Sequence, residues 1–177
     1  MRNPPPIPAA LILDPLAAVP TSMGKRARQQ LSELREAYQL SMRERMQGVK
    51  MNAPETIAEA FTPFLGPLPV EHMAAMALGP SLKMLGAPSL VTRGDTDGVD
   101  APLRAILRNV LVLEAVSFAV AHNHPSGDPT PSAADEAVTK RLVAAGRAVD
   151  CLLVDHLIIS RGGAWTSLRR DRPDLWR

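Results

Sequence analysis

The chain is poor in the residues on which several classes of protein depend. Only 3% of its 177 residues are aromatic, which excludes extensive stacking of nucleic-acid bases on aromatic side chains. The single cysteine, Cys151, excludes an intramolecular disulfide and fits a reducing compartment. It stands next to an apolar Leu-Leu-Val sequence, so we expect it to be a core residue.

Long hydrophobic runs are missing as well. No apolar stretch approaches the roughly 20 residues that a membrane-spanning helix requires, and the N-terminus has no convincing export signal. We therefore expect a cytoplasmic protein that makes no use of a membrane.

The composition that is present indicates a folded domain with an appendage. A hydrophobic fraction of 46% over 177 residues is enough for a buried core, built mainly from alanine, leucine and valine. The pattern changes near residue 50, which divides the chain into a proline-rich segment with a basic helix (residues 1–50) and a domain (residues 51–177). Helical and strand-like segments alternate in the domain, which favours an α/β fold with a mixed β-sheet flanked by helices and a short N-terminal helical extension.

Hydrophobic periodicity and breaker residues predict the individual elements. Pro54 suits the first turn of a helix, and Gly146 is expected to stop one. Residues 71–78 are helical by propensity, although their apolar character also suits a buried strand. The expected helices are residues 25–46, 52–62, 101–113 and 133–145, and the expected strands are residues 116–121, 151–159 and 164–168.

The helix expected near the N-terminus is amphipathic and basic. Leu31, Leu34 and Tyr38 form its apolar stripe. Residues 25–50 contain seven basic and three acidic side chains, an excess of four positive charges. Such a surface can meet phosphate in weak, sequence-independent DNA binding, and it can equally be a solvated helix face.

Two histidines and a carboxylate stand at a spacing that one metal ion can use. His122 and His124 follow an apolar run, and side chains at i and i+2 of an extended chain point the same way. Asp135 falls in the first turn of the next expected helix, three residues after Ser132. Two imidazoles and one carboxylate leave a fourth tetrahedral position open, which predicts a hydrolytic zinc site. The alternative is that Ser132 and Asp135 form an ordinary helix cap.

This pattern resembles the metal-binding signature of the JAB/MPN (JAMM) metalloprotease superfamily, which is His-x-His, seven residues, Ser, two residues, Asp. The string from His122 to Ser132 looks like one branch, the RadC family of bacterial DNA-repair-associated proteins. Further matches are Arg93-Gly94 and Arg104, and the resemblance extends over residues 52–167, most firmly over residues 93–160. It implies a JAB/MPN fold with cytidine-deaminase-like layering.

The resemblance also implies roles for individual residues. His122, His124 and Asp135 would bind one Zn²⁺ ion, and Ser132 would stabilise the developing oxyanion. The resemblance also places Asp155 and His156 close to these ligands. The alternative for His156, which stands in an apolar strand, is a hydrogen-bonded core histidine.

The general base is expected to be Glu71. JAMM hydrolases carry a glutamate at the start of the first sheet strand, and Glu71 matches that place if residues 71–78 form a strand. RadC relatives commonly carry a second glutamate four residues before the Arg-Gly pair, where this chain has Ser89. Serine cannot accept a proton near neutral pH, so a base at that position would leave the site impaired. The nearby Asp95, Asp97 and Asp100 are expected to form a solvated turn.

The implied activity is amide or isopeptide hydrolysis in an unknown protein or peptide substrate, by zinc-activated water. The competing hypothesis is a non-catalytic metal-binding scaffold associated with DNA repair or with DNA-bound partners, and an oligomer is possible in either case. Residues 16–20 with Gly24-Lys25 resemble the end of the helix-hairpin-helix segment of RadC relatives. Thr21-Ser22-Met23 replaces its glycine-rich hairpin, so we expect a truncated remnant.

Overall fold

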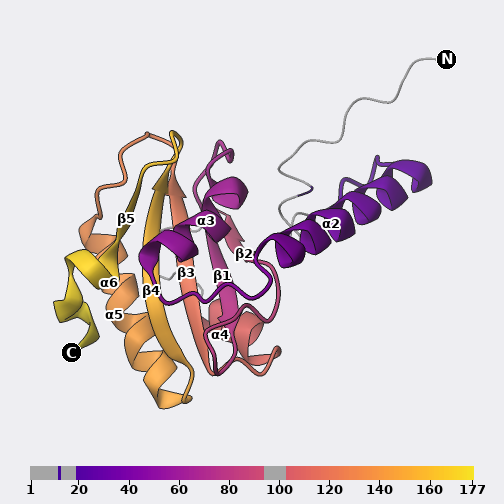
Figure 1. Ribbon diagram of the computed structural model, residues 1–177. Coiled ribbons are helices and arrows are strands. Elements are labelled where there is room, and N and C mark those ends of the chain that lie inside the picture. Colours follow the sequence, from indigo (N-terminus) through magenta and orange to yellow (C-terminus); the bar gives the residue numbers. More distant parts are fainter. Residues whose placement is uncertain (1–11, 13–18, 94–102) are drawn as a thin grey trace.

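A five-stranded mixed β-sheet forms the centre of the molecule in a computed structural model, which describes residue 12, residues 19–93 and residues 103–177 (Figure 1). The strand order is β2-β1-β3-β4-β5. β3 and β4 are parallel, whereas the β1–β2, β1–β3 and β4–β5 pairs are antiparallel. The strands are β1 (His72–Leu78), β2 (Ser89–Arg93), β3 (Ser117–His124), β4 (Leu152–Ser160) and β5 (Trp165–Ser167).

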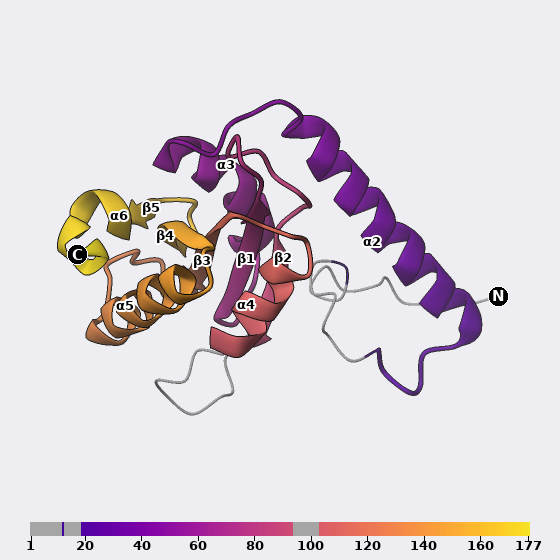
Figure 2. The same cartoon turned by 90° about the horizontal axis from the view of Figure 1, so that it is seen from below.

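Helices cover both faces of the sheet, which confirms the predicted α/β class (Figure 2). α3 (Pro54–Leu65) packs on one face, and α4 (Leu103–Leu111) and α5 (Ala133–Ala148) pack on the other. Because β1 and β3 lie between two helical layers, they are apolar on both sides, which is why their sequences do not alternate. β1 forms despite its helical propensity because it pairs with strands on both sides.

Gly146 does not stop its helix, contrary to the prediction. α5 continues to Ala148, and the chain turns at Asp150, whose φ is 52°. A Cβ atom on Gly146 would lie 2.4 Å from the carbonyl oxygen of Cys151 and 3.1 Å from Cε1 of Phe118. The glycine therefore allows close packing of α5 against the sheet, and it does not end the helix.

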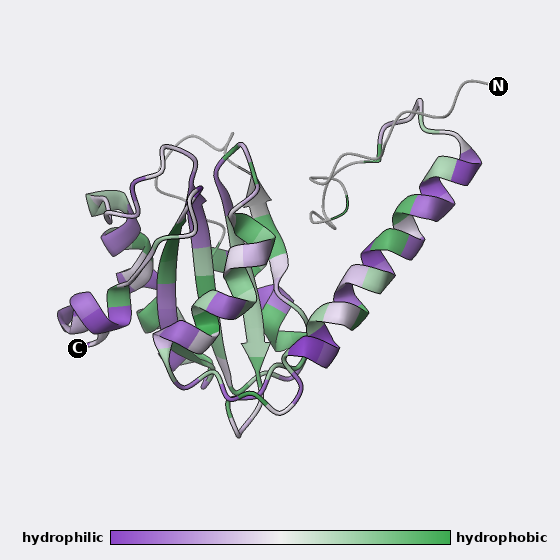
Figure 3. Ribbon diagram, turned by 45° about the horizontal axis from the view of Figure 1, so that its top comes forward, coloured by the Kyte–Doolittle hydropathy of each residue, from purple (hydrophilic) through white to green (hydrophobic). Residues whose placement is uncertain are grey.

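α2 (Lys25–Arg45) extends away from the sheet, and among the described residues its contacts with the core of the domain lie toward its C-terminal end (Figure 1). Met42 and Met46 join the core on the α3 side, and the ring of Tyr38 stacks on Phe64 with 6.0 Å between the centroids. Apolar and polar residues are mixed along the rest of the helix (Figure 3). The N-terminal helical extension is thus present, whereas residues 16–18 of the hairpin-like segment lie outside the described residues.

The C-terminal tail packs on its own domain. It forms α6 (Leu168–Asp171) and the 3-10 helix η1 (Pro173–Trp176), which the sequence patterns did not predict. Trp176 is buried, donates from Nε1 to the carbonyl oxygen of Leu153 at 2.9 Å, and lies beneath the guanidinium of Arg169. None of the helices in the described parts of the chain is long and apolar enough to cross a bilayer.

Candidate metal centre

Two histidines meet at the end of β3. The strand runs on to His124, three residues further than predicted, so His122 and His124 both project toward the face that carries α5. Their Nε2 atoms are 3.0 Å apart. His122 is buried and His124 is partly exposed, so the pair lies at the boundary between core and solvent.

Asp135 completes the group from the first turn of α5. Its Oδ1 lies 3.1 Å from Nε2 of His122, and its Oδ2 lies 3.7 Å from Nε2 of His124. Oδ2 also accepts hydrogen bonds from the backbone N and the Oγ of Ser132, both at 2.7 Å, while Ser132 Oγ accepts from the Asp135 backbone N at 3.2 Å. The helix cap is therefore present, and it holds the other carboxylate oxygen toward the histidines.

The carboxyl group of Asp135 is ionised in this setting. Burial raises its pKa, but the hydrogen bond and charge of His122 and the two hydrogen bonds from Ser132 outweigh burial, so the pKa lies well below its usual range. An ionised carboxylate beside two imidazole nitrogens is a donor set for a cation.

Glu71 faces the same cluster from the start of β1. One of its carboxylate oxygens lies within 4.8 Å of ring nitrogens of both His122 and His124. Glu71 is exposed, so its carboxylate reaches the cluster from the solvent side.

Asn123 holds the segment that carries Glu71, a role that the sequence analysis missed. As the middle residue of the motif, it projects from β3 to the face opposite the histidines. Its Oδ1 accepts from the backbone N of His72 at 2.8 Å, and its Nδ2 donates to the carbonyl oxygens of Leu68 and Val70 at 3.2 and 3.1 Å. The signal available in the sequence was a fully polar amide within a buried strand, which requires hydrogen-bond partners.

The Nδ1 atoms of His122 and His124, which face away from the cluster, also have hydrogen-bond partners. His124 Nδ1 lies 2.8 Å from the carbonyl oxygen of Asp128, so Nδ1 carries a hydrogen, and in the neutral ring the free electron pair lies on Nε2. His122 Nδ1 lies 2.9 Å from Nε2 of His156, whose Nδ1 lies 2.7 Å from Oγ1 of Thr139. Thr139 was not foreseen because it becomes part of the site only through the packing of α5 on β4.

His156 is linked to the cluster by its hydrogen bond with His122. It is completely buried, and burial together with the neighbouring His122 lowers its pKa well below the usual value. His156 is therefore neutral and can donate from one ring nitrogen and accept at the other.

Asp155 lies on the opposite face of β4 and supports a different part of the structure. Its carboxylate accepts from Ser167 Oγ at 2.7 Å, from the backbone N of Arg169 at 3.0 Å and from the backbone N of His156 at 2.7 Å. Burial raises its pKa, although these hydrogen bonds act against that effect. Asp155 thus ties β4 to the C-terminal elements.

Ser89 is not next to the histidines. It pairs with Ala75 of β1, while His122 pairs with Met73 of the same strand, so Ser89 lies two strands and two residues away. Its hydroxyl donates to Oδ1 of Asn109 in α4 at 2.8 Å. The other acids considered as bases, Asp95, Asp97 and Asp100, lie outside the described residues.

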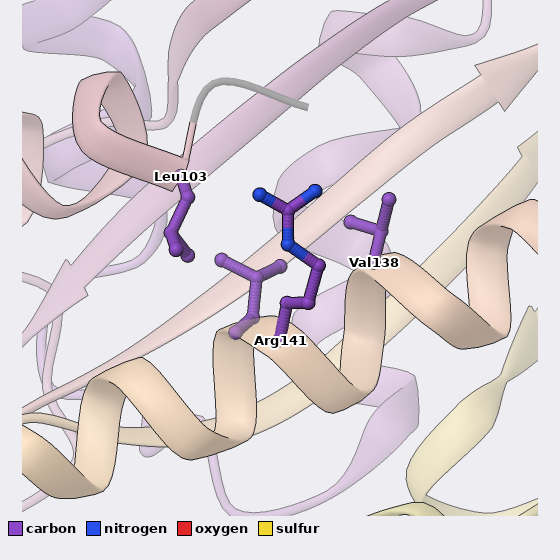
Figure 4. Close-up of a pocket in the computed structure, with 4 residues that line it drawn as sticks. Leu103, Val138 and Arg141 are labelled. Carbon is purple, nitrogen blue, oxygen red and sulfur yellow. The ribbon is translucent and has the colours of Figure 1, made fainter. Parts of the chain in front are cut away.

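A small hollow, separate from the histidine cluster, lies between α4 and α5 (Figure 4). It is lined by Leu103, Val138, Arg141 and Leu142 and contains no residue of the histidine cluster. Among the residues that the structure describes, its lining is apolar apart from Arg141 and offers no group suited to catalysis.

The cluster fits a zinc ion. At Zn–N distances of about 2.0–2.1 Å, two ligand atoms of a tetrahedral site stand about 3.3 Å apart. The His122–His124 and His122–Asp135 separations, 3.0 and 3.1 Å, are close to that value. Imidazole nitrogens with carboxylate oxygens suit zinc better than calcium or magnesium.

The fold and the cluster define a class, namely mixed α/β domains that bring two histidines from a strand end to a carboxylate at the next helix start. The RadC-like JAB domain family matches residues 51–173, so this chain belongs to that family. The UPF0758 protein of Xanthomonas euvesicatoria pv. vesicatoria is 37% identical over 130 residues, which are 73% of this chain and 56% of that protein. The UPF0758 protein of Bordetella avium is 39% identical over 120 residues, 68% of this chain and 53% of that protein. The chain spans about half the length of these relatives.

Proposed function

We propose that this chain binds one zinc ion through His122, His124 and Asp135 and hydrolyses an amide or isopeptide bond in a protein or peptide. The observation that carries the proposal is that His124 Nε2 and Asp135 Oδ1 lie 3.0 and 3.1 Å from His122 Nε2. Glu71 lies beside this group. Membership of the RadC-like JAB domain family supports it.

Contact distances and the helix cap support Asp135 as the third ligand. The two oxygens of Asp135 lie 3.1 and 3.7 Å from the histidine nitrogens, near the separation of about 3.3 Å between tetrahedral ligands. One Glu71 carboxylate oxygen lies within 4.8 Å of the histidine nitrogens, a range that includes both direct ligation and contact through a water molecule. Asp135 is also held by the cap, whereas Glu71 remains exposed for a proton transfer.

The chain's own residues would supply the general base and the hydrogen bond that stabilises the oxyanion. Bound zinc would supply a Lewis acid that lowers the pKa of water and polarises a carbonyl. Glu71 would take the proton from the attacking water and return it to the leaving amine. The Ser132 hydroxyl donates to Asp135 Oδ2 in this structure. Donation to the oxyanion would therefore require that hydroxyl to rotate.

The alternative proposal is a metal-binding scaffold without catalysis, associated with DNA repair or DNA-bound partners. In that case the ion would serve the structure, and Glu71 would contribute nothing to a reaction. The proximity of Glu71 to both histidines favours the hydrolase.

Asp135→Asn should weaken zinc binding strongly, because it removes the charged ligand while an amide oxygen can still accept from the backbone N of Ser132 in the capping box. Isothermal titration of metal-free protein with Zn²⁺ measures the effect. Asp128→Asn is the matched control, because the Asp128 carboxylate bonds to Thr130 and only its backbone carbonyl contacts His124. Native zinc affinity in Asp135→Asn would refute this ligand assignment.

DNA binding, if α2 provides it, should be weak, sequence-independent and abolished as salt rises. Lys25, Arg26 and Arg43 are exposed on α2, and replacing all three with alanine should reduce the salt slope of log K by about 0.9 for each phosphate that the helix no longer neutralises. Fluorescence anisotropy of a labelled duplex measures the slope. A control variant removes three exposed basic residues elsewhere, namely Arg104, Lys140 and Arg161. An equal reduction in the control, or tight binding at high salt, would contradict the prediction.

A further inference from the structure

We propose that Thr139 is a positioning residue that fixes the tautomer of His156 and thereby makes His122 present a free electron pair to the metal site. The inference rests on the proposed function, because it concerns how one ligand of the zinc site is prepared. It is carried by three linked hydrogen bonds, two of them buried and one partly buried, that run from the backbone of α5 through β4 to β3.

The hydroxyl of Thr139 determines which atom donates and which accepts in each of these hydrogen bonds. Oγ1 lies 2.6 Å from the carbonyl oxygen of Asp135 and 2.7 Å from Nδ1 of His156. A carbonyl oxygen can only accept, so the single hydroxyl hydrogen must go to Asp135. The opposite orientation would leave two oxygen atoms 2.6 Å apart with no hydrogen between them. Thr139 therefore accepts from His156, and Nδ1 of His156 carries a hydrogen.

The next two steps follow from the chemistry of a neutral imidazole. His156 is completely buried, and a neutral ring with its hydrogen on Nδ1 has only an acceptor at Nε2. That acceptor lies 2.9 Å from Nδ1 of His122, so His122 donates there. In the neutral form of His122 the free electron pair then lies on Nε2, the atom that faces Asp135 Oδ1 and His124 Nε2.

The arrangement differs from the usual support of a metal-binding histidine. Such a histidine normally donates to a carboxylate, a backbone carbonyl or water, each of which can accept without a change of tautomer. The Asp128 carbonyl does this for His124. His122 instead donates to another imidazole, which accepts in only one of its two neutral tautomers. Without Thr139, His156 could turn its hydrogen toward His122, and His122 would then carry its own hydrogen on the metal-facing nitrogen.

The test compares two substitutions at Thr139 in the full chain. Thr139→Val keeps the shape of this buried side chain but removes the hydroxyl, whereas Thr139→Ser keeps the hydroxyl. Zn²⁺ affinity, measured by competition with a chromophoric chelator, should fall about 10- to 100-fold in Thr139→Val, as it does when other metal ligands are deprived of their supporting hydrogen bond. Thr139→Ser should keep native affinity. Equal affinities of Thr139→Val and the native chain, or an equal fall in both variants, would overturn the proposal.

A second measurement reads the tautomer itself and needs no variant. Long-range ¹H–¹⁵N correlation spectra of the native chain should show His156 with its hydrogen on Nδ1, with and without zinc. A hydrogen on Nε2 would overturn the proposal even if Thr139→Val were too unstable to study. If the native chain binds no zinc, the proposed function fails, but the tautomer of His156 in the metal-free protein still decides this inference.

Discussion

The double substitution His122→Ala with His124→Ala is expected to abolish metal binding. Protein purified without chelators should contain about one zinc per chain, and the variant should contain almost none, because it loses two of the three protein ligands of a tetrahedral site. Elemental analysis by mass spectrometry measures the content directly. The native chain should also gain stability on addition of Zn²⁺, by about 2.7 kcal/mol at a free concentration one hundred times the dissociation constant. The variant should gain none.

A matched control removes a histidine outside the cluster. His72 is buried, but its Nδ1 bonds to the carbonyl oxygen of Val70, and it does not belong to the group formed by Glu71, His122 and His124. His72→Gln should therefore retain the metal. Unchanged metal content in the double variant would refute the site. Absence of metal from both the double variant and His72→Gln would point to a general defect in folding.

The part of the fold that carries the proposed ligands was open to prediction because it depends on local geometry. Side chains at i and i+2 of a strand share a face, and a carboxylate three residues after a helix-capping serine faces the helix start. His122, His124 and Asp135 needed no long-range information beyond the contact between a strand end and the following helix. Glu71 is different. Its segment is helical by propensity, so the strand prediction came from the resemblance to a family, and the contacts of β1 on both sides explain the outcome.

The residues that hydrogen-bond to the proposed site could not be predicted from the sequence alone. Thr139 and His156 are 17 positions apart and meet only because α5 packs on β4. Asn123 reaches Leu68 across 55 positions. Gly146 was predicted to be a helix stop because glycine commonly ends helices, but here close packing against Cys151 decides its place. In each case a tertiary contact assigns the role, and no local pattern carries that information.

The second large effect is expected at Glu71, the proposed general base. Zinc alone can lower the pKa of water to about 7, but hydrolysis also needs a proton acceptor and later a donor to the leaving amine. A positioned carboxylate contributes about 10² to 10⁴ in rate. Glu71→Gln should therefore lose turnover by that factor and keep its zinc, because the amide preserves the shape but cannot accept the proton. Release of aminocoumarin from a library of peptide aminocoumarin amides measures turnover, and elemental analysis measures the zinc.

Two further variants decide between Glu71 and the position at which RadC relatives commonly carry a second glutamate. Glu33→Gln makes the same chemical change on exposed α2 and should leave turnover unchanged. Ser89→Glu should also change little, because Ser89 bonds to Asn109 and lies two strands from His122. If Glu71→Gln stays fully active while Ser89→Glu raises turnover sharply, the base belongs at position 89 and the native chain is an impaired enzyme. If Glu71→Gln instead loses its zinc, Glu71 is a ligand, and the assignment of ligand and base between the two carboxylates is wrong.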